Sequence, residues 1–326
     1  MRPGEIHFMA VDYLRLSLTD RCNLNCVYCT PREKNGYLNH EDLLRHEELA
    51  RAAAAFVRAG VKKIRLTGGE PLLRKNIVGL VNMLSAIPGL KELALTTNGL
   101  LLKDLAEPLR EAGLDRVNVS LDTLKKDVFK KITGSAGLDK VWAGIEAALA
   151  AGFGEVKLNV VLMKGLNDLE AADFARLSVK LPLSVRFIEF YPTNERASRL
   201  KGALVTTAET KRRIEEALGP LLQLPAAAAD GPASVYKLRG AAGKIGFISG
   251  RSDYFCGACN RVRMDCTGRI YPCLFSPATH SLRDLLRANA PDAALDDYLK
   301  KAFLVKSKYK KDSPTAGNIE MSSLGG

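Results

Sequence analysis

The sequence predicts an α/β protein whose main body is an incomplete, TIM-like (β/α)6 barrel, and three observations support this fold class. Six short apolar runs between residues 14 and 192 alternate with helical segments, as in repeated βαβ units around a parallel sheet. Polar residues gather where these runs end, which is where barrel folds place their chemistry. A closed barrel has about eight strands, so six strands predict a barrel with one open side.

The expected elements follow one another at regular intervals. The apolar run LRLSL at 14–18 predicts the first strand, and the alanine-rich segment 46–60 predicts a helix that ends at Gly60. Right-handed crossovers between successive strands wind such a chain in one direction. The other strands are expected at 62–71, 92–99, 115–122, 155–165 and 183–192, with helices at about 74–86, before Gly113 and before Gly152. The polar strand-end residues are Gly68, Gly69, Glu70, Thr96, Thr97, Asn98, Ser120, Asp122, Glu189 and Tyr191.

The alternation of strands and helices stops after residue 200. An Ala/Pro-rich stretch at 224–233 separates a short helix from an expected hairpin, and four cysteines follow between residues 256 and 273. We therefore expect two domains: a partial barrel over 1–200 with the N-terminal cysteines, and a cysteine-bearing extension over 201–326 that covers the open side.

Composition narrows the class of protein. No run of eighteen apolar residues occurs, and the N-terminus lacks the apolar core of a secretion signal, so we expect a cytoplasmic protein without a membrane span. Seven cysteines in that compartment indicate metal binding or catalysis more than disulfides. The net charge of +12 favours an anionic partner. Because only 6% of residues are aromatic and no basic stripe interleaves with them, a small anion is favoured over nucleic acid.

The stretch TDRCNLNCVYC at 19–29 places Cys22, Cys26 and Cys29 within one loop after the first strand. Thiolates bind zinc or iron–sulfur clusters, and both kinds of site normally use four ligands. Three cysteines around a [4Fe–4S] cube would leave one iron open for another molecule. From spacing alone, a zinc site and unrelated buried cysteines remain alternatives.

The same stretch resembles the signature of the radical S-adenosylmethionine (SAM) enzymes, CxxxCxxC with an aromatic residue before the last cysteine. The resemblance implies a [4Fe–4S] cluster on Cys22, Cys26 and Cys29 whose open iron holds SAM and cleaves it to a 5′-deoxyadenosyl radical. It also implies that Tyr28 lies near the adenine and that TGGEP at 67–71 supplies a backbone contact to SAM at Gly69. The remaining SAM contacts implied by the resemblance are Ser120 and Tyr191. Tyr191 stands where the family commonly has methionine, which leaves the form of its contact open.

A second group of cysteines comprises Cys256, Cys259, Cys266 and Cys273. Their spacing fits a four-cysteine zinc site or a second three-cysteine cluster in which Cys266 is a buried filler or a surface thiol. CxxCNRVR with a third cysteine after it, together with IRLTGGEPLLR, LTTNG and the terminal Gly-Gly, is similar to the GTP 3′,8-cyclase family of molybdenum cofactor biosynthesis. That resemblance implies that Cys256, Cys259 and Cys273 hold a second [4Fe–4S] cluster whose open iron binds the guanine base.

The resemblance also implies how GTP is held. Arg261 and Arg263 occupy alternate positions of RVR and can therefore point the same way. Arginines on strands also form ordinary ion pairs at barrel rims, which is the structural alternative. No set of carboxylates secures Mg²⁺, and the terminal Gly-Gly is expected to enter the active site. The GTP contacts implied by the resemblance are Arg15, Arg65, Thr96, Lys157, Arg261 and Arg263.

The implied reaction is the radical cyclisation of GTP to (8S)-3′,8-cyclo-7,8-dihydroguanosine 5′-triphosphate by a lyase. Its implied partners are an electron donor such as flavodoxin or ferredoxin and the downstream cyclic pyranopterin monophosphate synthase, and the resemblance is compatible with a homodimer. Two alternatives stay open. One is a radical SAM enzyme whose auxiliary cluster serves a peptide or another small molecule, and the other is a structural zinc or RNA-binding protein.

Overall fold

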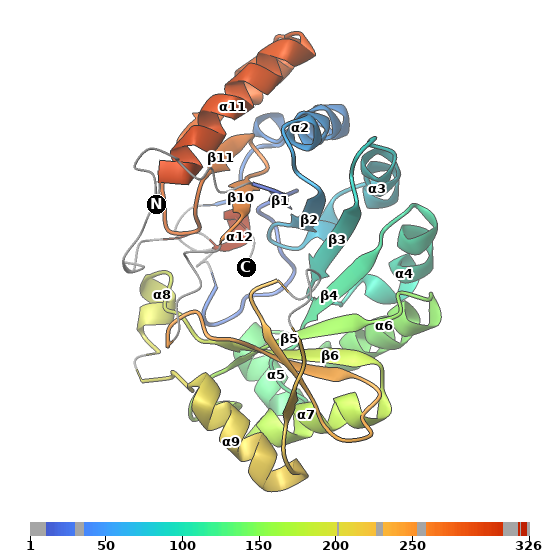
Figure 1. Cartoon of the computed structure of the whole chain (residues 1–326), viewed down its shortest axis with the longest axis vertical. Helices are drawn as coiled ribbons and strands as arrows, with labels where there is room; N and C mark the ends of the chain where they lie inside the picture. The colour runs from blue at the N-terminus through green and yellow to red at the C-terminus, as the bar shows by residue number, and fades with distance from the viewer. Residues whose placement is uncertain are drawn as a thin grey trace, which may run out of the picture.

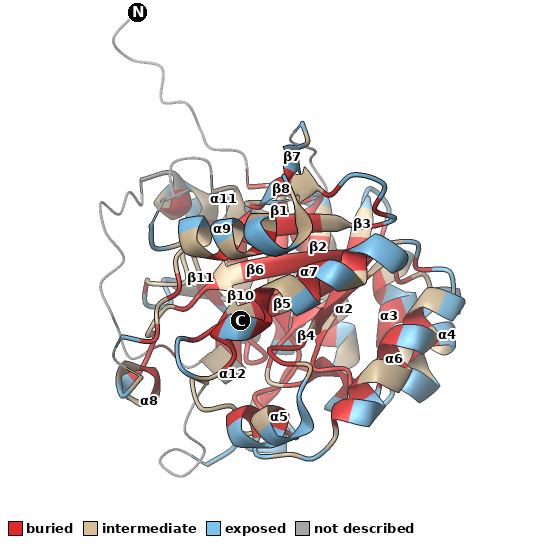
Figure 2. Ribbon diagram, turned by 90° about the horizontal axis from the view of Figure 1, so that it is seen from below, coloured by how far each residue is buried: buried red, intermediate tan, exposed pale blue. Residues whose placement is uncertain are grey.

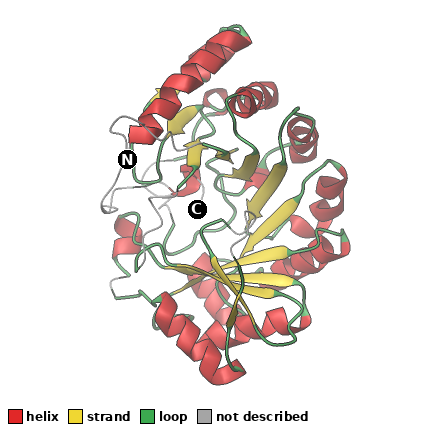
Figure 3. Ribbon diagram, viewed as in Figure 1, coloured by secondary structure: helices red, strands yellow, loops and turns green. Residues whose placement is uncertain are grey.

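A computed structural model of the chain describes residues 11–29, 36–200, 202–225, 231–252, 259–308, 319 and 321–324. Its strands form one curved, twelve-stranded sheet with the order β12-β11-β10-β1-β2-β3-β4-β5-β6-β9-β8-β7. Helices cover the outer, convex side of the curve, and the sheet does not close on itself (Figure 1; Figure 3). This arrangement confirms the predicted α/β partial barrel.

The six predicted strands form the centre of the sheet, in sequence order and all parallel. β2 to β6 are shorter than the apolar runs because several strand-end residues lie in the segments that follow the strands. The strands are β1 (Tyr13–Ser17), β2 (Lys63–Thr67), β3 (Glu92–Thr97), β4 (Arg116–Ser120), β5 (Val156–Leu162) and β6 (Leu183–Glu189). The connecting elements are η1 (His40–Asp42), α2 (His46–Arg58), η2 (Pro71–Leu73), α3 (Ile77–Ser85), α4 (Leu102–Glu111), α5 (Lys126–Thr133), α6 (Leu138–Ala150), η3 (Asp168–Glu170) and α7 (Ala171–Lys180).

Strand alternation separates the hydrophobic core from a polar interior. Leu14 and Leu16 of β1 are fully buried and pack in the core shared with the outer helices, where Figure 2 shows the buried residues gathered. Tyr13 and Arg15 therefore face the other way, into the barrel, because successive side chains of a strand point to opposite sides. The sequence thus places apolar side chains between the sheet and the outer helices, and basic side chains inside the barrel.

The C-terminal third lengthens the sheet at both edges, which the sequence did not predict. β10 (Arg261–Met264) pairs parallel with β1, and β9 (Lys244–Ile248) pairs parallel with β6. The expected hairpin is confirmed as antiparallel β8 (Ser234–Lys237) and β9. The other elements are α8 (Glu195–Ser198), α9 (Thr207–Leu218), β7 (Leu222–Gln223), β11 (Arg269–Tyr271), β12 (His280–Ser281), α10 (Arg283–Arg287), α11 (Asp292–Lys308) and α12 (Met321–Leu324). The domain boundary near residue 200 stays a prediction.

Ion pairs tie together the ends at which the barrel strands begin. Glu92 lies 2.6 Å from the Lys63 ammonium and 3.1 Å from the Arg116 guanidinium. Glu155 lies 3.7 Å from Lys157 and 3.5 Å from Lys244. These carboxylates neutralise part of the positive charge at that end of the barrel. Within the described residues, no helix combines the length and the hydropathy that crossing a bilayer requires.

Candidate active site

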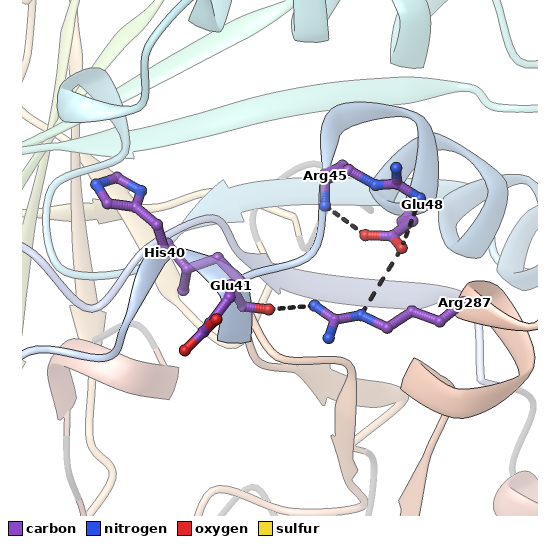
Figure 4. Close-up of a pocket in the computed structure, with 6 residues that line it drawn as sticks. His40, Glu41, Arg45, Glu48 and Arg287 are labelled. Carbon is purple, nitrogen blue, oxygen red and sulfur yellow. Dashed lines mark hydrogen bonds and ion pairs between the residues drawn. The ribbon is translucent and has the colours of Figure 1, made fainter.

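A surface pocket lies where η1, α2 and α10 meet (Figure 4). It is apart from the barrel interior. Its volume is about 540 Å³, and Arg45, Glu48 and Arg287 of its lining are engaged with one another. The Glu48 carboxylate accepts a 2.6 Å hydrogen bond from the Arg45 amide and lies 3.9 Å from the Arg287 guanidinium, which also donates to the Glu41 carbonyl. These contacts cap α2 and fasten α10 to it, so we assign the pocket a structural role.

The first cysteine loop is fastened to the barrel mouth by its backbone. The Asn25 and Val27 amides each donate a 2.9 Å hydrogen bond, to the carbonyls of Thr133 and Ile132 at the end of α5. The Arg196 guanidinium of α8 donates to the Asn25 side chain at 2.5 Å. Cys22, Cys26 and Cys29 form no disulfide bonds. The loop is thus held in place without any disulfide among its cysteines.

The three thiols lie close enough to influence one another. Burial raises the pKa of Cys26 well above its usual value, and the negative charges of Cys29, Asp122 and Cys22 raise it further. Cys22 Sγ accepts a hydrogen bond from the Leu24 amide at 3.4 Å, and Asn98 Nδ2 lies 3.9 Å from the same sulfur. Groups that donate to sulfur favour its thiolate form.

This donor set fits a [4Fe–4S] cluster, since three soft ligands come from one loop and each would hold a different iron. In the part of the chain that the structure describes, no three His, Cys, Asp or Glu side chains are grouped so as to hold a single metal ion. The spacing of the described cysteines therefore gives no support to a zinc site.

The glycines of TGGEP have a structural reason to be glycines. A Cβ on Gly68 would lie 2.4 Å from the Thr19 carbonyl oxygen, and one on Gly69 would lie 2.2 Å from that of Arg21. The Gly69 amide already donates to the Thr19 carbonyl at 2.7 Å. The segment therefore packs directly against the backbone that leads into the cysteine loop, and any larger residue would push the two apart.

Glu70 links the ends of β2 and β3 beside the cysteine loop. Its buried carboxylate accepts hydrogen bonds from the Leu72 amide at 3.0 Å, the Thr97 hydroxyl at 2.7 Å and the Asn98 amide at 2.7 Å. Burial nevertheless dominates and raises the pKa of Glu70 to about 7. Since Asn98 reaches toward Cys22, Glu70 positions a residue that contacts the first cysteine loop.

Tyr28 is anchored through its hydroxyl group. Tyr28 Oη donates a 2.6 Å hydrogen bond to Asp122, whose second oxygen accepts from the Val161 amide at 2.8 Å. Burial raises the pKa of Asp122 to about 6 despite these donors. The sequence placed Asp122 at the end of the fourth strand, but β4 ends at Ser120 and Asp122 lies two residues beyond it. Its role as the partner of Tyr28 was not foreseen. Ser120 lies two residues earlier on β4, paired in register with Asn159.

Tyr191 joins the end of β6 to the segment after Cys273. Its ring packs on that of Phe275, with the ring centroids 5.1 Å apart. Nearby, Glu189 accepts hydrogen bonds from the Thr207, Arg251 and Ser252 amides at 2.8–3.0 Å. These contacts connect the barrel mouth to both parts of the C-terminal extension.

Five residues of three adjacent strands form a cluster that we call the cationic cluster. In register, Tyr13 of β1 is level with Arg261 of β10, and Arg15 is level with both Arg263 and Arg65. Burial lowers the pKa of Arg15 well below its usual range, and the positive charges of Arg263, Arg65 and Arg261 lower it further. Burial and the charge of Arg261 likewise lower the pKa of Arg263 to about 10. The cluster consists of Tyr13, Arg15, Arg65, Arg261 and Arg263.

Two further basic residues, on β5 and β6, extend the positive charge of the cationic cluster across the barrel. Lys157 of β5 has no exposed side-chain surface, and burial together with the positive charge of Arg186 lowers its pKa to about 7. Arg186 of β6 is buried as well. Arg186 was not predicted from the sequence, although the alternation of RFIEF around it was a signal that it faces the interior. Arg65 is joined to β3 by a 3.3 Å hydrogen bond from Nη1 to the Thr96 hydroxyl.

The second group of cysteines lies partly within the described residues: Cys259 and Cys273 are described, whereas the predicted ligand Cys256 is not. Lys306 of α11 is buried and lies 3.6 Å from Cys259 Sγ. The positive charges of Lys306 and Arg261 lower the pKa of Cys259 against the opposing effect of burial. Two soft donors in a cationic setting fit a thiolate-bound cluster.

Cys266 differs from these cysteines because it lies in the core. It is 1% exposed, and burial and the charges of Asp265 and Asp20 raise its pKa to about 12. Of the two interpretations of Cys266 as a non-ligand, the structure therefore favours a buried filler over a surface thiol.

Among the described cysteines, Cys22 leaves the strands at one end, and Cys259 and Cys273 lie at the opposite end. Cys22 follows β1, whereas Cys259 precedes β10, which runs parallel to β1. Cys273 follows β11, which is antiparallel to β10, and so starts from the same end as Cys259. The cationic cluster occupies the strands between the two groups.

The C-terminal segment reaches this interior. Arg263 Nη1 donates a 3.0 Å hydrogen bond to the carbonyl of Leu324 in α12, and the Ile319 amide donates to the Thr193 carbonyl at 2.9 Å. Figure 1 places α12 inside the curve of the sheet. The predicted entry of Gly325 and Gly326 concerns residues outside the described part of the chain and stays a prediction.

Comparison with known proteins agrees with this geometry. The Radical SAM superfamily model matches residues 16–178, and the Molybdenum Cofactor Synthesis C model matches residues 183–312. The GTP 3′,8-cyclase of Moorella thermoacetica is 46% identical over 97% of this chain and 98% of its own length. The chain belongs to the GTP 3′,8-cyclase family. The family member of Heliobacterium modesticaldum is 47% identical over 91% of this chain and 90% of the relative.

Solved structures agree at the level of the fold. The S-adenosylmethionine-bound SuiB of Streptococcus suis aligns with a TM-score of 0.60 at 15% identity, covering 90% of this chain and 68% of SuiB. Membership of the GTP 3′,8-cyclase family makes the protein a radical SAM enzyme and implies a [4Fe–4S] cluster and SAM.

Proposed function

We propose that this radical SAM enzyme is a lyase that converts GTP to (8S)-3′,8-cyclo-7,8-dihydroguanosine 5′-triphosphate for molybdenum cofactor biosynthesis. The observation that carries the proposal is the cationic cluster on strands that Cys22 follows at one end and that Cys259 and Cys273 flank at the other end. A triphosphate needs several cations at close range, and Arg15, Arg65 and Arg263 are level on three adjacent strands.

At one end, Cys22, Cys26 and Cys29 would hold a cluster. When bound there, the cluster and SAM supply the radical that activates a C–H bond of the substrate. The side chains nearby give SAM its position: Tyr28 is fixed by Asp122, and Gly69 is packed against the loop backbone. The proposed SAM contacts are Tyr28, Gly69, Ser120 and Tyr191.

At the other end, Cys256, Cys259 and Cys273 would hold a second cluster that orients the guanine base. The Arg65 guanidinium is held between Tyr13 and Thr96, so its direction is set before a ligand arrives. A bound triphosphate would also favour the charged form of Lys157, because a nearby anion raises a lysine pKa. The proposed GTP contacts are Arg15, Arg65, Thr96, Lys157, Arg261 and Arg263.

The function is tested by anaerobic turnover with SAM, dithionite and GTP. We expect 5′-deoxyadenosine and loss of GTP together, from protein that contains about eight irons per chain. Deoxyadenosine formed only when a peptide is added would overturn GTP as the substrate. Protein that reconstitutes with zinc and without sulfide would overturn the radical chemistry.

The same proposal includes the location of the enzyme, its partners, its assembly and its domain division. We propose a cytoplasmic location, an electron donor of the flavodoxin or ferredoxin type, product transfer to cyclic pyranopterin monophosphate synthase, and assembly as a homodimer. We also propose the domain division at residue 200, since the βα alternation of the barrel ends with β6 and α8.

Arg263→Ala is expected to weaken GTP binding by about 10- to 100-fold, the range for losing a charged hydrogen bond, while changing SAM binding less than about twofold. Equilibrium binding of GTP and of SAM to the anaerobic protein measures the two affinities. Arg212→Ala is the matched control, since Arg212 is exposed and pairs with Glu216 on α9. Equal weakening of GTP and SAM by Arg263→Ala would contradict its assigned role.

Lys306→Met is expected to lower the reduction potential of the second cluster by on the order of 60 mV, the one-electron equivalent of a tenfold equilibrium change. The reason is that the ammonium group beside Cys259 Sγ stabilises the more negative, reduced state. An EPR-monitored redox titration measures the potential. Lys300→Met, at an exposed lysine paired with Asp297 on the same helix, should leave it unchanged. An unshifted potential in Lys306→Met would rule out this electrostatic role.

A further inference from the structure

Tyr13 is a titratable group in the middle of the cationic cluster, and it was not among the site residues predicted from the sequence. Its ring centroid lies 5.2 Å from Lys63 Nζ, 5.5 Å from Arg261 Cζ and 6.0 Å from Arg65 Cζ. Arg65 Nε donates a 2.5 Å hydrogen bond to Tyr13 Oη. Tyr13 is 9% exposed, so water screens these interactions little.

Every element around the phenol presents mainly positive charge to it. β1 contributes Arg15, β2 contributes Lys63 and Arg65, and β10 contributes Arg261 and Arg263. Among the described residues, Glu92 of β3 binds Lys63 and Arg116, and Asp12 accepts from Asn260. The negative charges of Cys259 and Cys273 act on Arg263. The Leu324 carbonyl of α12 binds Arg263.

We propose that Tyr13 is a proton-exchanging counter-ion: where its hydroxyl is ionised in the free protein, the phenolate balances the cationic cluster, and it takes up a proton when a polyphosphate binds. The ligand class rests on the proposed function. In this exchange a proton moves from solvent to Tyr13 Oη, and no covalent bond between heavy atoms forms or breaks. Tyr13 is thus a positioning residue, which couples substrate binding to pH and holds Arg65 through its oxygen.

The charge balance gives the direction of this exchange. Burial alone would raise the pKa of Tyr13, yet the positive charges of Arg65, Arg15, Lys63 and Arg261 outweigh burial and lower the pKa to about 8. A bound polyphosphate neutralises those cations and repels a phenolate, so it raises the pKa again. The neutral phenol is therefore favoured in the complex, and anion affinity falls as pH rises through the pKa of the free protein.

Calorimetry with inorganic triphosphate tests the proposal on the anaerobic holoenzyme. Titrations at pH 8 in two buffers of different ionisation enthalpy give the number of protons taken up. We expect the native protein to take up about half a proton more than Tyr13→Phe, since a group with a pKa of about 8 is half ionised at that pH. Between pH 7 and pH 9, the native affinity should fall about tenfold relative to that of Tyr13→Phe.

Taking the difference between the two proteins removes the contribution of Lys157, which also titrates in this range. Tyr13→Phe keeps the ring and its cation contacts, and thermal unfolding checks that the variant is folded. Tyr236→Phe is the matched control, because the Tyr236 ring on β8 also faces a cation, Lys211 at 4.5 Å, outside the cluster. It should reproduce the native proton uptake.

The outcomes separate this proposal from the proposed function. Equal proton uptake and equal pH dependence in the native protein and Tyr13→Phe would overturn the role of Tyr13, whether or not GTP is cyclised. Failure of the native protein to bind triphosphate at any of these pH values would also overturn it. The expected proton difference without turnover of GTP would support Tyr13 and count against the proposed reaction.

Discussion

Cys22→Ala is expected to reduce 5′-deoxyadenosine formation from SAM to the level of protein without iron. Cys22 is one of only three thiols in the first loop, and its sulfur accepts hydrogen bonds from a backbone amide and approaches Asn98, contacts that alanine cannot make. With two cysteines left, the first cluster loses a corner. Iron content should fall from about eight to about four atoms per chain. Chromatography of the anaerobic reaction and iron analysis measure both effects.

Cys266→Ala is the matched control for this prediction. Cys266 is another free thiol, but it lies in the core beside Asp265 and is not among the proposed ligands. We expect its iron content and turnover to stay at native levels, with a modest loss of thermal stability from the small cavity. SAM cleavage at the native rate by Cys22→Ala, or loss of iron from Cys266→Ala, would show that the ligands are assigned wrongly.

The sequence predicted the central strands and helices because their signals are local. The apolar runs of β1 to β6 alternate with helices that end at glycines such as Gly113 and Gly152, both of which adopt positive φ angles. The polar residues at strand ends followed from the architecture, because parallel strands bring their carboxyl ends to one mouth. Glu70, Asn98 and Asp122 lie at that mouth and contact the first cysteine loop or its neighbours.

Contacts between distant segments were harder to predict. The pairing of β10 with β1 joins residues almost 250 positions apart in the sequence. The segment RVRM is also too short and too highly charged to predict a strand inside a sheet. Without that pairing, nothing in the sequence places Arg261 level with Tyr13. Lys306 was missed for the same reason, since its contact with Cys259 depends on how α11 returns to the barrel. A titratable group acquires its function from neighbours that only the tertiary fold supplies.

Cys273→Ala is expected to stop GTP cyclisation while some SAM cleavage continues without product. Cys273 leaves β11 at the end of the sheet opposite the Cys22 loop, so its loss should spare the three thiols of the first group. Its charge contributes to the environment of Arg263, which places it beside the proposed GTP contacts. Chromatography of deoxyadenosine and of the cyclised nucleotide separates the two activities.

This variant and Cys22→Ala should each retain about four irons, but not the same four. In Cys273→Ala, SAM should alter the EPR spectrum of the remaining cluster and GTP should not, whereas Cys22→Ala should show the reverse. A ligand bound to an open iron changes the electronic structure of the cluster, and each variant would keep only one such iron. Cyclisation at the native rate by Cys273→Ala would mean that the second group of cysteines does not hold the substrate, because the base would then be oriented by the barrel alone.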